Sequence, residues 1–523
     1  MHVLRFVRCV QKANLTRSRL MSASDATALS GLSNASQRCS IYLHESTIDR
    51  GSVLSGYPRV KRRWAESQYA TELWVKRALL RSPLRVDNAS AADLIFIATN
   101  YSMWCEVGRV RAAHGLLQEA LRQHLGSISS RAKFGSIFQF FACLPPEHKQ
   151  MVALLETVDA PKRQEHHSVS PYVVSRPDWL VGLSMPPQRL RAWSERPLLF
   201  MAGHMPKLYI SPTSPTRYRI WKQVRNEPNV TMLSSTINCT IGSFRACASP
   251  EATRALKWPA NGSMSEDAAR RFFTTFCRGA CTSMYAHHTS CAAGAGSSTR
   301  EMQRVFEANC RTYRSVDFSL EYDDMQRDTR RLSHDEYLAH AMAHRFCLVA
   351  PGDSASTHKI AESIALGGAG GCVPVFVVGG GCSTDAARRV LPYTRWLDYC
   401  ELGYFITVEA ARADMLGALR HLRAISADEW HAKSARLRAV RDAFVFRANS
   451  SLARPSAAEF LLHEMCSLQR ANATSSTAGS GSARWGLSRC GYGCPSSRRP
   501  RTRRKAKAEP NPNERKGLRG DGG

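Results

Sequence analysis

The sequence has no long hydrophobic run, and it has far fewer acidic than basic side chains. A membrane-spanning helix needs about 18 or more consecutive apolar residues, and no window of the chain approaches that length. The basic segment 1–12 contains only a broken apolar stretch, so it lacks the hydrophobic region of a signal peptide. The 43 acidic residues against 72 basic ones leave a net charge of +29, which favours anionic partners.

The length of 523 residues predicts two domains and additional tails, because single cores rarely grow beyond about 250 residues. Residues 1–37 are expected to form a poorly structured leader, and 38–190 an N-terminal α/β domain. Residues 195–466 are expected to form a C-terminal α/β domain with a Cys-rich insertion at 234–312. Residues 470–523 are rich in Ser, Gly, Pro and basic side chains, which predicts a disordered basic tail.

Two short apolar runs in the C-terminal domain enclose a polar turn. The run at 346–349 is too short for a helix and is closed by Pro351 and Gly352, so it predicts a buried parallel strand. A second strand is predicted at 372–378. The helix between them follows a turn rich in hydroxyl side chains that can cap it, namely Ser354, Ser356 and Thr357.

Lys359 and Glu362 lie three residues apart at the start of this helix, so both project from one face close to the end of the first strand. Backbone N–H groups and the positive end of the helix dipole also lie there, which suits a phosphate or a nucleotide. The alternative is an ordinary βαβ unit whose polar residues only cap a helix. These residues alone leave both interpretations open.

Further strands and helices are predicted on both sides of this unit. A strand within 196–204 is closed by Gly203, and Arg217 and Arg219 lie on the helix expected to follow. This pair of arginines either contacts a diphosphate or lies on a solvated helix face. Helices are also predicted at 333–344, 411–424 and 428–446, and strands of the N-terminal domain near 41–44, 94–98, 138–142 and 179–183.

Several of these segments occur in the order of the motifs of exostosin-like glycosyltransferases. The C-terminal blocks are Phe346-Cys347-Leu348, Pro351-Gly352-Asp353, Lys359-x-x-Glu362 and Cys372-Val373-Pro374-Val375. Other blocks with similar counterparts in the family are 68–72, 79–83, 92–97, 196–204, 391–393, 398–399 and 404–408. Across most of the chain before the tail, the sequence therefore resembles the exostosin family and its plant glucuronyl- and galactosyltransferase relatives.

The resemblance implies an α/β fold with two facing Rossmann-like domains, the arrangement called GT-B. It implies transfer of a sugar from a nucleotide-sugar, expected to be a UDP-sugar, to a glycan or glycoprotein acceptor. The nucleotide-sugar is a co-substrate on the C-terminal domain, the acceptor binds the N-terminal domain, and no cofactor or metal is implied. The implied donor-binding residues are Gly203, Arg217, Arg219, Gly352, Asp353, Ser354, Ser356, Lys359 and Glu362.

Two features depart from the family pattern. Lys359 stands where the family has Arg, so a point charge replaces a planar group that could bind phosphate through two hydrogen bonds. The glycines at 367–371 lengthen the interval before the next strand and should end or loosen the helix there. Either they form a tolerated insertion at the surface or the gene model is slightly wrong.

Neither the catalytic base nor the class of function follows from the residues alone. The base could be Asp353, Glu362 or an acidic residue of the N-terminal domain, although Glu362 better suits a ligand of a ribose or sugar hydroxyl. The competing function is a non-catalytic protein that binds glycan or nucleic acid on a degenerate glycosyltransferase fold. The basic run 498–507 suits an anionic surface or polymer, and the alternative is a solvated tail without a partner.

Sequons and cysteines point to a secretory compartment, with the Golgi expected from the resemblance. Nine of the 13 asparagines begin an Asn-x-Ser/Thr sequon: Asn14, Asn34, Asn88, Asn100, Asn229, Asn238, Asn261, Asn449 and Asn472. Six of the 17 cysteines lie between Cys239 and Cys310, which predicts a local set of disulfides. The alternative is a zinc site with ligands drawn from Cys277, Cys281, His287, His288 and Cys291.

Overall fold

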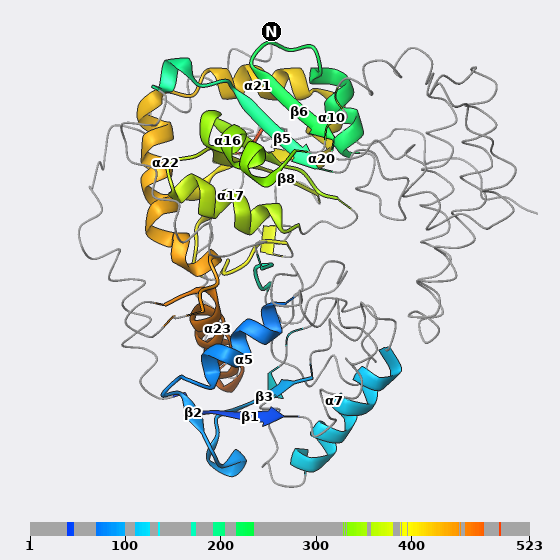
Figure 1. Cartoon of the computed structure of the whole chain (residues 1–523), viewed down its shortest axis with the longest axis vertical. Coiled ribbons are helices and arrows are strands. Elements are labelled where there is room, and N and C mark those ends of the chain that lie inside the picture. The colour runs from blue at the N-terminus through cyan, green and yellow to red at the C-terminus, as the bar shows by residue number, and fades with distance from the viewer. Residues whose placement is uncertain are drawn as a thin grey trace, which may run out of the picture. The chain divides into compact units, whose positions relative to one another are not determined.

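The structure, a computed structural model, contains two parallel β-sheets with helices packed around them (Figure 1). It describes residues 39–45, 70–99, 110–125, 134–135, 137, 169–173, 192–203, 216–234, 328, 330, 332–352, 357–379, 387–388, 390–394, 396–448, 450, 455–474 and 491–492. All of them belong to one unit, Ser18–Cys494. The α/β class predicted from the sequence is confirmed.

The N-terminal sheet has the strand order β2-β1-β3-β4, with every pair parallel. Its strands are β1 Ile41–Glu45, β2 Arg85–Val86, β3 Leu94–Ala98 and β4 Phe134–Gly135, and its helices are α5 Thr71–Leu79 and α7 Val110–Leu125. Every residue of β3 is buried, as a parallel strand covered on both faces requires. The strands predicted near 41–44 and 94–98 are present, and those near 138–142 and 179–183 lie outside the described residues.

The C-terminal sheet has the order β10-β9-β8-β7-β5-β6, again with every pair parallel. Its strands are β5 Leu199–Gly203, β6 Val230–Ser234, β7 Phe346–Val349, β8 Val373–Val378, β9 Tyr404–Thr407 and β10 Gly491–Tyr492. Apolar residues fill β7 and β8, and every position of both strands is buried. The strands predicted at 346–349 and 372–378 are therefore central strands of this sheet.

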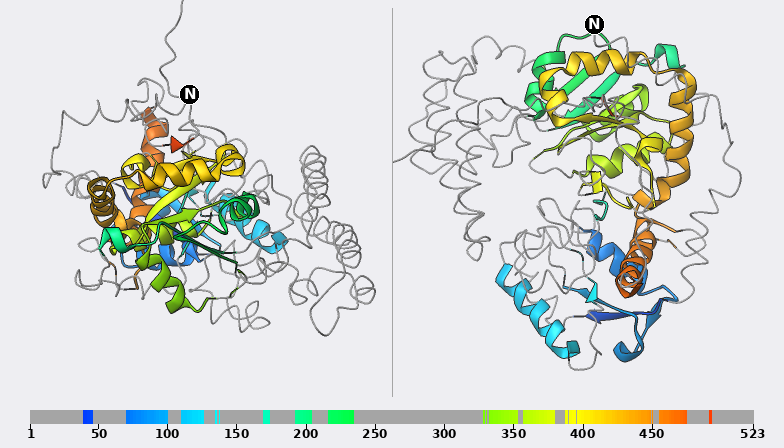
Figure 2. Two further views of the ribbon diagram at one scale, coloured as in Figure 1. Left: turned by 90° about the horizontal axis from the view of Figure 1, so that it is seen from above. Right: turned by 180° about the vertical axis from the view of Figure 1, so that it is seen from behind.

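Helices cover both faces of the C-terminal sheet (Figure 2). The helices α16 His334–Ala343 and α17 Lys359–Gly368 pack together on one face. The helices α10 Thr216–Val224, α20 Val408–Ala413 and α21 Met415–Arg423 pack together on the other, and α22 Ala427–Val440 packs against α17. The single helix predicted at 411–424 is wrong, because the carboxylate of Asp414 accepts the N–H of Gly417 and begins a second helix there.

The glycines at 367–371 do not form a surface insertion, so that expectation is wrong. Gly367 and Gly368 are the last residues of α17 and are buried against α22. A Cβ atom on Gly368 would lie 2.8 Å from the carbonyl oxygen of Leu437. The chain then turns at Gly370, whose φ of 94° favours glycine. Gly367 and Gly368 are needed because α17 and α22 approach too closely for side chains there.

The final helix, α23 Ala457–Thr474, packs against α5 and β3 of the N-terminal sheet. A disulfide joins Cys466 on α23 to Cys39, which precedes β1, with 6.0 Å between their Cα atoms. The predicted C-terminal domain therefore ends in a helix that is tied to the N-terminal sheet.

Part of the predicted disordered tail has regular secondary structure. Helix α23 continues to Thr474, and Gly491–Tyr492 form β10, which pairs with Phe405 and Ile406 of β9. The prediction of disorder over 470–523 is wrong at these positions. For Gly491–Tyr492 the reason is that the edge of β9 offers backbone groups with which another strand can pair. The basic run 498–507 and the leader 1–37 lie outside the described residues, as does the Cys-rich region except for Ser234.

Candidate functional site

The strand order of the C-terminal sheet reverses between β5 and β7. The chain passes from β5 outward to β6, and then returns to the other side of β5 to form β7, β8 and β9. Strands β5 and β7 are direct neighbours, with Leu199 opposite Phe346. In open parallel sheets, ligands bind at the carboxyl ends of the strands where the order reverses. Gly203 ends β5, and Ala350, Pro351 and Gly352 follow β7, so these residues lie at that position.

Arg217 lies between these two strand ends. It projects from the first turn of α10, and its Nε and Nη2 atoms donate to the carbonyl oxygen of Ala350 at 3.2 and 2.9 Å. A Cβ atom on Gly352 would lie 3.0 Å from Nη2, and one on Gly203 would lie 3.4 Å from Nη1. Gly352 thus lets the backbone approach the guanidinium group closely, whereas the distance at Gly203 is an ordinary contact. The structure brings together three predicted site residues, Gly203, Arg217 and Gly352.

Arg219 does not join this group. It is exposed on α10, whereas Arg217 is half-buried and the intervening Tyr218 is buried. Residues two apart on a helix point about 200° away from each other, so the two side chains leave different faces. Arg219 therefore lies on a solvated helix face, which was one of the two interpretations of this pair of arginines. The predicted site residues Asp353, Ser354 and Ser356 lie outside the described residues.

Lys359 and Glu362 form an ion pair in the first turn of α17, with 2.6 Å between Nζ and Oε2. The hydroxyl of Tyr337, on α16, donates to the same Oε2 atom at 3.1 Å. The ammonium of Lys359 also lies 3.7 Å from the centre of the Tyr337 ring. Of the predicted capping hydroxyls, Thr357 contacts the backbone N–H of Lys359 at 3.4 Å. The structure thus joins two predicted residues and adds Tyr337 to them.

The carboxylate of Glu362 is buried, with 5% of the residue exposed. Burial acts to raise the pKa of Glu362, but the charges of Lys359 and His358 and the hydrogen bonds from Lys359 and Tyr337 hold it below its ordinary value. Burial and the neighbouring charge of Glu362 raise the pKa of Tyr337 well above its ordinary value. At neutral pH the site therefore holds a charged carboxylate and a neutral phenol that donates to it.

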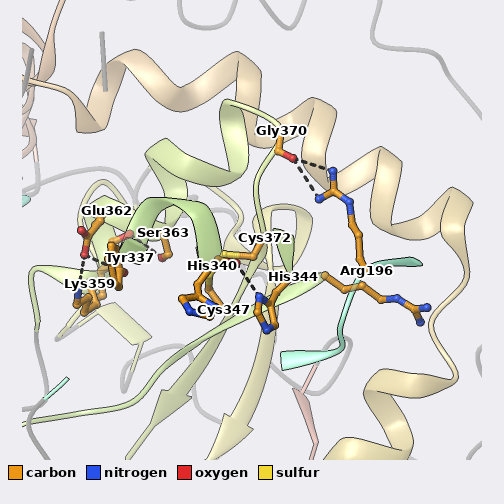
Figure 3. Close-up of a disulfide and its surroundings, with 12 residues drawn as sticks. Arg196, Tyr337, His340, His344, Cys347, Lys359, Glu362, Ser363, Gly370 and Cys372 are labelled. Carbon is orange, nitrogen blue, oxygen red and sulfur yellow. Dashed lines mark hydrogen bonds and ion pairs between the residues drawn. A yellow bond between two sulfur atoms is a disulfide. The ribbon is translucent and has the colours of Figure 1, made fainter. Parts of the chain in front are cut away.

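Tyr337 and the disulfide Cys347–Cys372 were not singled out by the sequence analysis. Figure 3 shows the cluster of Tyr337, Lys359 and Glu362 away from this disulfide and from Arg196. Cys347 lies in β7 and Cys372 directly precedes β8, with 5.3 Å between their Cα atoms. Two cysteines on strands predicted to be consecutive were a usable signal for a disulfide. Tyr337 had no such signal, since it lies 25 residues from its partner Glu362.

Neither a membrane-spanning helix nor a metal-binding cluster occurs in the part of the chain that the structure describes. No helix there combines the length and apolar character needed to cross a membrane. Nor does that part hold a group of three or more His, Cys, Asp or Glu side chains placed to bind a metal ion. The residues named as zinc ligands from the sequence, Cys277, Cys281, His287, His288 and Cys291, lie outside it.

Comparison of the chain with models of protein families gives no match, and comparison with curated proteins gives none either. The features of the molecule that bear on function are the strand order, Arg217 with its neighbouring glycines, and the cluster around Glu362.

Proposed function

We propose that this chain is a glycosyltransferase that binds a nucleotide-sugar, in particular a UDP-sugar, at the carboxyl ends of β5 and β7. The observation that carries the proposal is the position of Arg217, whose guanidinium is held against Gly203 and Gly352 where the strand order reverses. A fixed cation at this point suits a diphosphate, because charged donors form strong hydrogen bonds to phosphate oxygens.

The same arrangement suits the departure of a nucleoside diphosphate. In the proposed transfer, an acceptor hydroxyl oxygen forms a bond to the anomeric carbon while the bond to the diphosphate oxygen breaks. The diphosphate leaves with the electron pair, and the hydroxyl proton passes to a base. A guanidinium that is already fixed by Ala350 stabilises the developing negative charge without reorganising. This task is assigned to Arg217 and to the positive end of the α17 helix dipole, and it requires no divalent metal.

Glu362 is assigned to the sugar part of the nucleotide. A buried, charged carboxylate accepts hydrogen bonds strongly, and ribose and hexose hydroxyls are suitable donors. The motif order that resembles exostosin-like enzymes supports the same assignment. In the full proposal, the domain of the C-terminal sheet binds the donor, and the domain of the N-terminal sheet faces it in a GT-B arrangement and binds a glycan or glycoprotein acceptor.

The proposed compartment is the Golgi or another secretory lumen. Nine sequons support it, as do the disulfides Cys39–Cys466 and Cys347–Cys372, because disulfides persist in oxidising compartments. The basic run 498–507 is assigned to an anionic surface or polymer.

Thermal unfolding in the presence of nucleotides tests the function. We expect a UDP-sugar or UDP to raise the melting temperature, because a ligand at about 100 times its Kd adds about 2.7 kcal/mol to stability. Arg217→Met should lower UDP affinity at least about tenfold, which corresponds to about 1.4 kcal/mol. Arg438→Met, which removes an exposed cation of α22, is the matched control and should behave like the wild type.

A folded wild type that no nucleotide or nucleotide-sugar stabilises would overturn the proposal. A protein that binds nucleotide or glycan but never releases UDP from a UDP-sugar, across a panel of glycan acceptors, would instead be the non-catalytic binding protein.

A further inference from the structure

The proposed function leaves the role of Lys359 undefined. A lysine at a helix start beside a nucleotide site would ordinarily be assigned to phosphate. Its surroundings in this chain point elsewhere. The ammonium lies 2.6 Å from the Oε2 atom of Glu362 and 3.7 Å from the centre of the Tyr337 ring, and 21% of the side chain is exposed.

The charge of Lys359 is therefore already paired. The negative charge of Glu362, in direct contact with the ammonium, offsets most of the attraction that Lys359 would exert on a second anion. Because the pair is largely buried, solvent screens the interaction between the two charges only weakly. A phosphate that approached Lys359 would also approach the negative charge of Glu362. The face of the Tyr337 ring provides a second attraction that holds the ammonium in place.

The contacts of Glu362 are concentrated on one of its two oxygen atoms. Lys359 and Tyr337 both donate to Oε2, and the Nε2 atom of His358 lies 4.0 Å from the same atom. No residue in the described part of the chain forms a hydrogen bond to Oε1, and this atom is not fully sequestered, so it retains contact with solvent. The carboxylate thus has one oxygen engaged by its neighbours and one oxygen without a hydrogen bond from the described residues.

We propose that Lys359 is a positioning residue that acts through Glu362. Together with Tyr337 it holds Oε2, so that Oε1 is presented as an acceptor for a ribose hydroxyl of the nucleoside. This inference rests on the proposed function, and it assigns the phosphate groups to Arg217 and not to Lys359.

The test compares probes that contain different parts of a nucleotide. Uridine, UDP and inorganic pyrophosphate, with guanosine and GDP in parallel, are titrated into the full chain and their binding is followed by ligand-observed NMR. Lys359→Met should lower the affinity for the nucleoside and for its diphosphate by the same factor, about tenfold, and leave the affinity for pyrophosphate unchanged. Arg217→Met should lower the affinity for pyrophosphate and the nucleoside diphosphates but not the affinity for the nucleosides. Lys222→Met, on the exposed side of α10, is the matched control.

Three further variants separate positioning from a merely structural role. Lys359→Arg should retain most of the affinity, because arginine can also donate to Oε2, and Tyr337→Phe should lose part of it. In a Glu362→Gln background, Lys359→Met should have little additional effect, since a residue that acts through Glu362 has no separate contribution.

The inference is overturned if loss of the Lys359 charge lowers the affinity for pyrophosphate and the nucleoside diphosphates while the nucleosides bind as before. That result would mean that Lys359 contacts phosphate. Additive losses in the Glu362→Gln background would overturn it as well. A wild type that binds none of the probes overturns the proposed function and this inference with it. If Lys359→Met does not fold, the Lys359→Arg and Tyr337→Phe variants decide the question by the same comparison.

Discussion

The guanidinium of Arg217 donates two hydrogen bonds to the carbonyl oxygen of Ala350, 133 residues further along the chain. Arg217 belongs to the helix that connects β5 to β6, and Ala350 directly follows β7. The contact therefore ties together the two strands between which the strand order reverses. It also sets the position of the cation that the proposed donor site uses.

Gly352→Ala should weaken UDP binding more than it weakens the fold. The new Cβ would lie 3.0 Å from Nη2 and 3.3 Å from Cζ of Arg217, so the end of this flexible side chain must move. We expect about a tenfold loss of affinity, or about 1.4 kcal/mol, with little change in melting temperature. Gly203→Ala is the control, because its Cβ would have an ordinary contact of 3.4 Å with Nη1. Equal affinities in both variants and the wild type would contradict this role of Gly352.

Gly368→Ala and Gly115→Ala should change stability in opposite directions. A Cβ on Gly368 would lie 2.8 Å from the backbone oxygen of Leu437 and 3.0 Å from Cβ of Arg441, which predicts a loss of about 1–3 kcal/mol. A Cβ on Gly115, in the middle of α7, would meet nothing within 4 Å, so alanine should stabilise the protein by up to about 1 kcal/mol. Equilibrium unfolding in urea measures both. A Gly368 variant as stable as the wild type would contradict the close packing of α17 on α22.

Acid should weaken the N-terminal sheet through a buried pair of histidines. Nδ1 of His44 and Nε2 of His124 lie 2.9 Å apart. Burial and the charge of His124 lower the pKa of His44, against an opposing effect of Glu119, and burial lowers the pKa of His124. Unfolded histidines titrate near about 6.5. The contribution of the pair is therefore fully present above about pH 6.5 and is lost as the pH falls towards the lowered values.

The measurement is urea unfolding at pH 7.5 and 5.5, followed by a probe of the N-terminal sheet. The loss of stability between the two values should be smaller in a His44→Gln, His124→Gln double variant than in the wild type. An equal loss in the two proteins would show that this pair does not contribute to the acid sensitivity.

Asn88 and Asn229 should carry N-linked glycans after expression through a eukaryotic secretory route. Both begin sequons and both are exposed, Asn88 at the cap of a short 3-10 helix and Asn229 in a turn with φ of 63°. Enzymatic deglycosylation in heavy-oxygen water followed by peptide mass spectrometry should mark both asparagines. Asn226 is the control, because it is exposed near Asn229 but is followed by Glu and Pro. Unmodified Asn88 and Asn229 in secreted protein would refute the prediction.

The central strands and the start of α17 could be predicted from the sequence alone. Short apolar runs bounded by Pro and Gly predicted β7 and β8, and the spacing of Lys359 and Glu362 predicted that they share a helix face. These features follow from residues within one or two turns of each other, where backbone geometry alone sets which side chains are neighbours. Compartment, donor and acceptor stay predictions from composition and motif order.

Which of the predicted residues meet depends on the packing of the elements in three dimensions. Arg217 and Arg219 look equivalent in the sequence, but the position of α10 places one at the strand ends and exposes the other. The partners Tyr337 and Glu362 lie on different helices, Gly367 and Gly368 are explained by a helix that follows later, and Cys39 meets Cys466 from 427 residues away. Each of these contacts depends on how separate elements pack, and the free energy that selects the packing is shared among many buried residues.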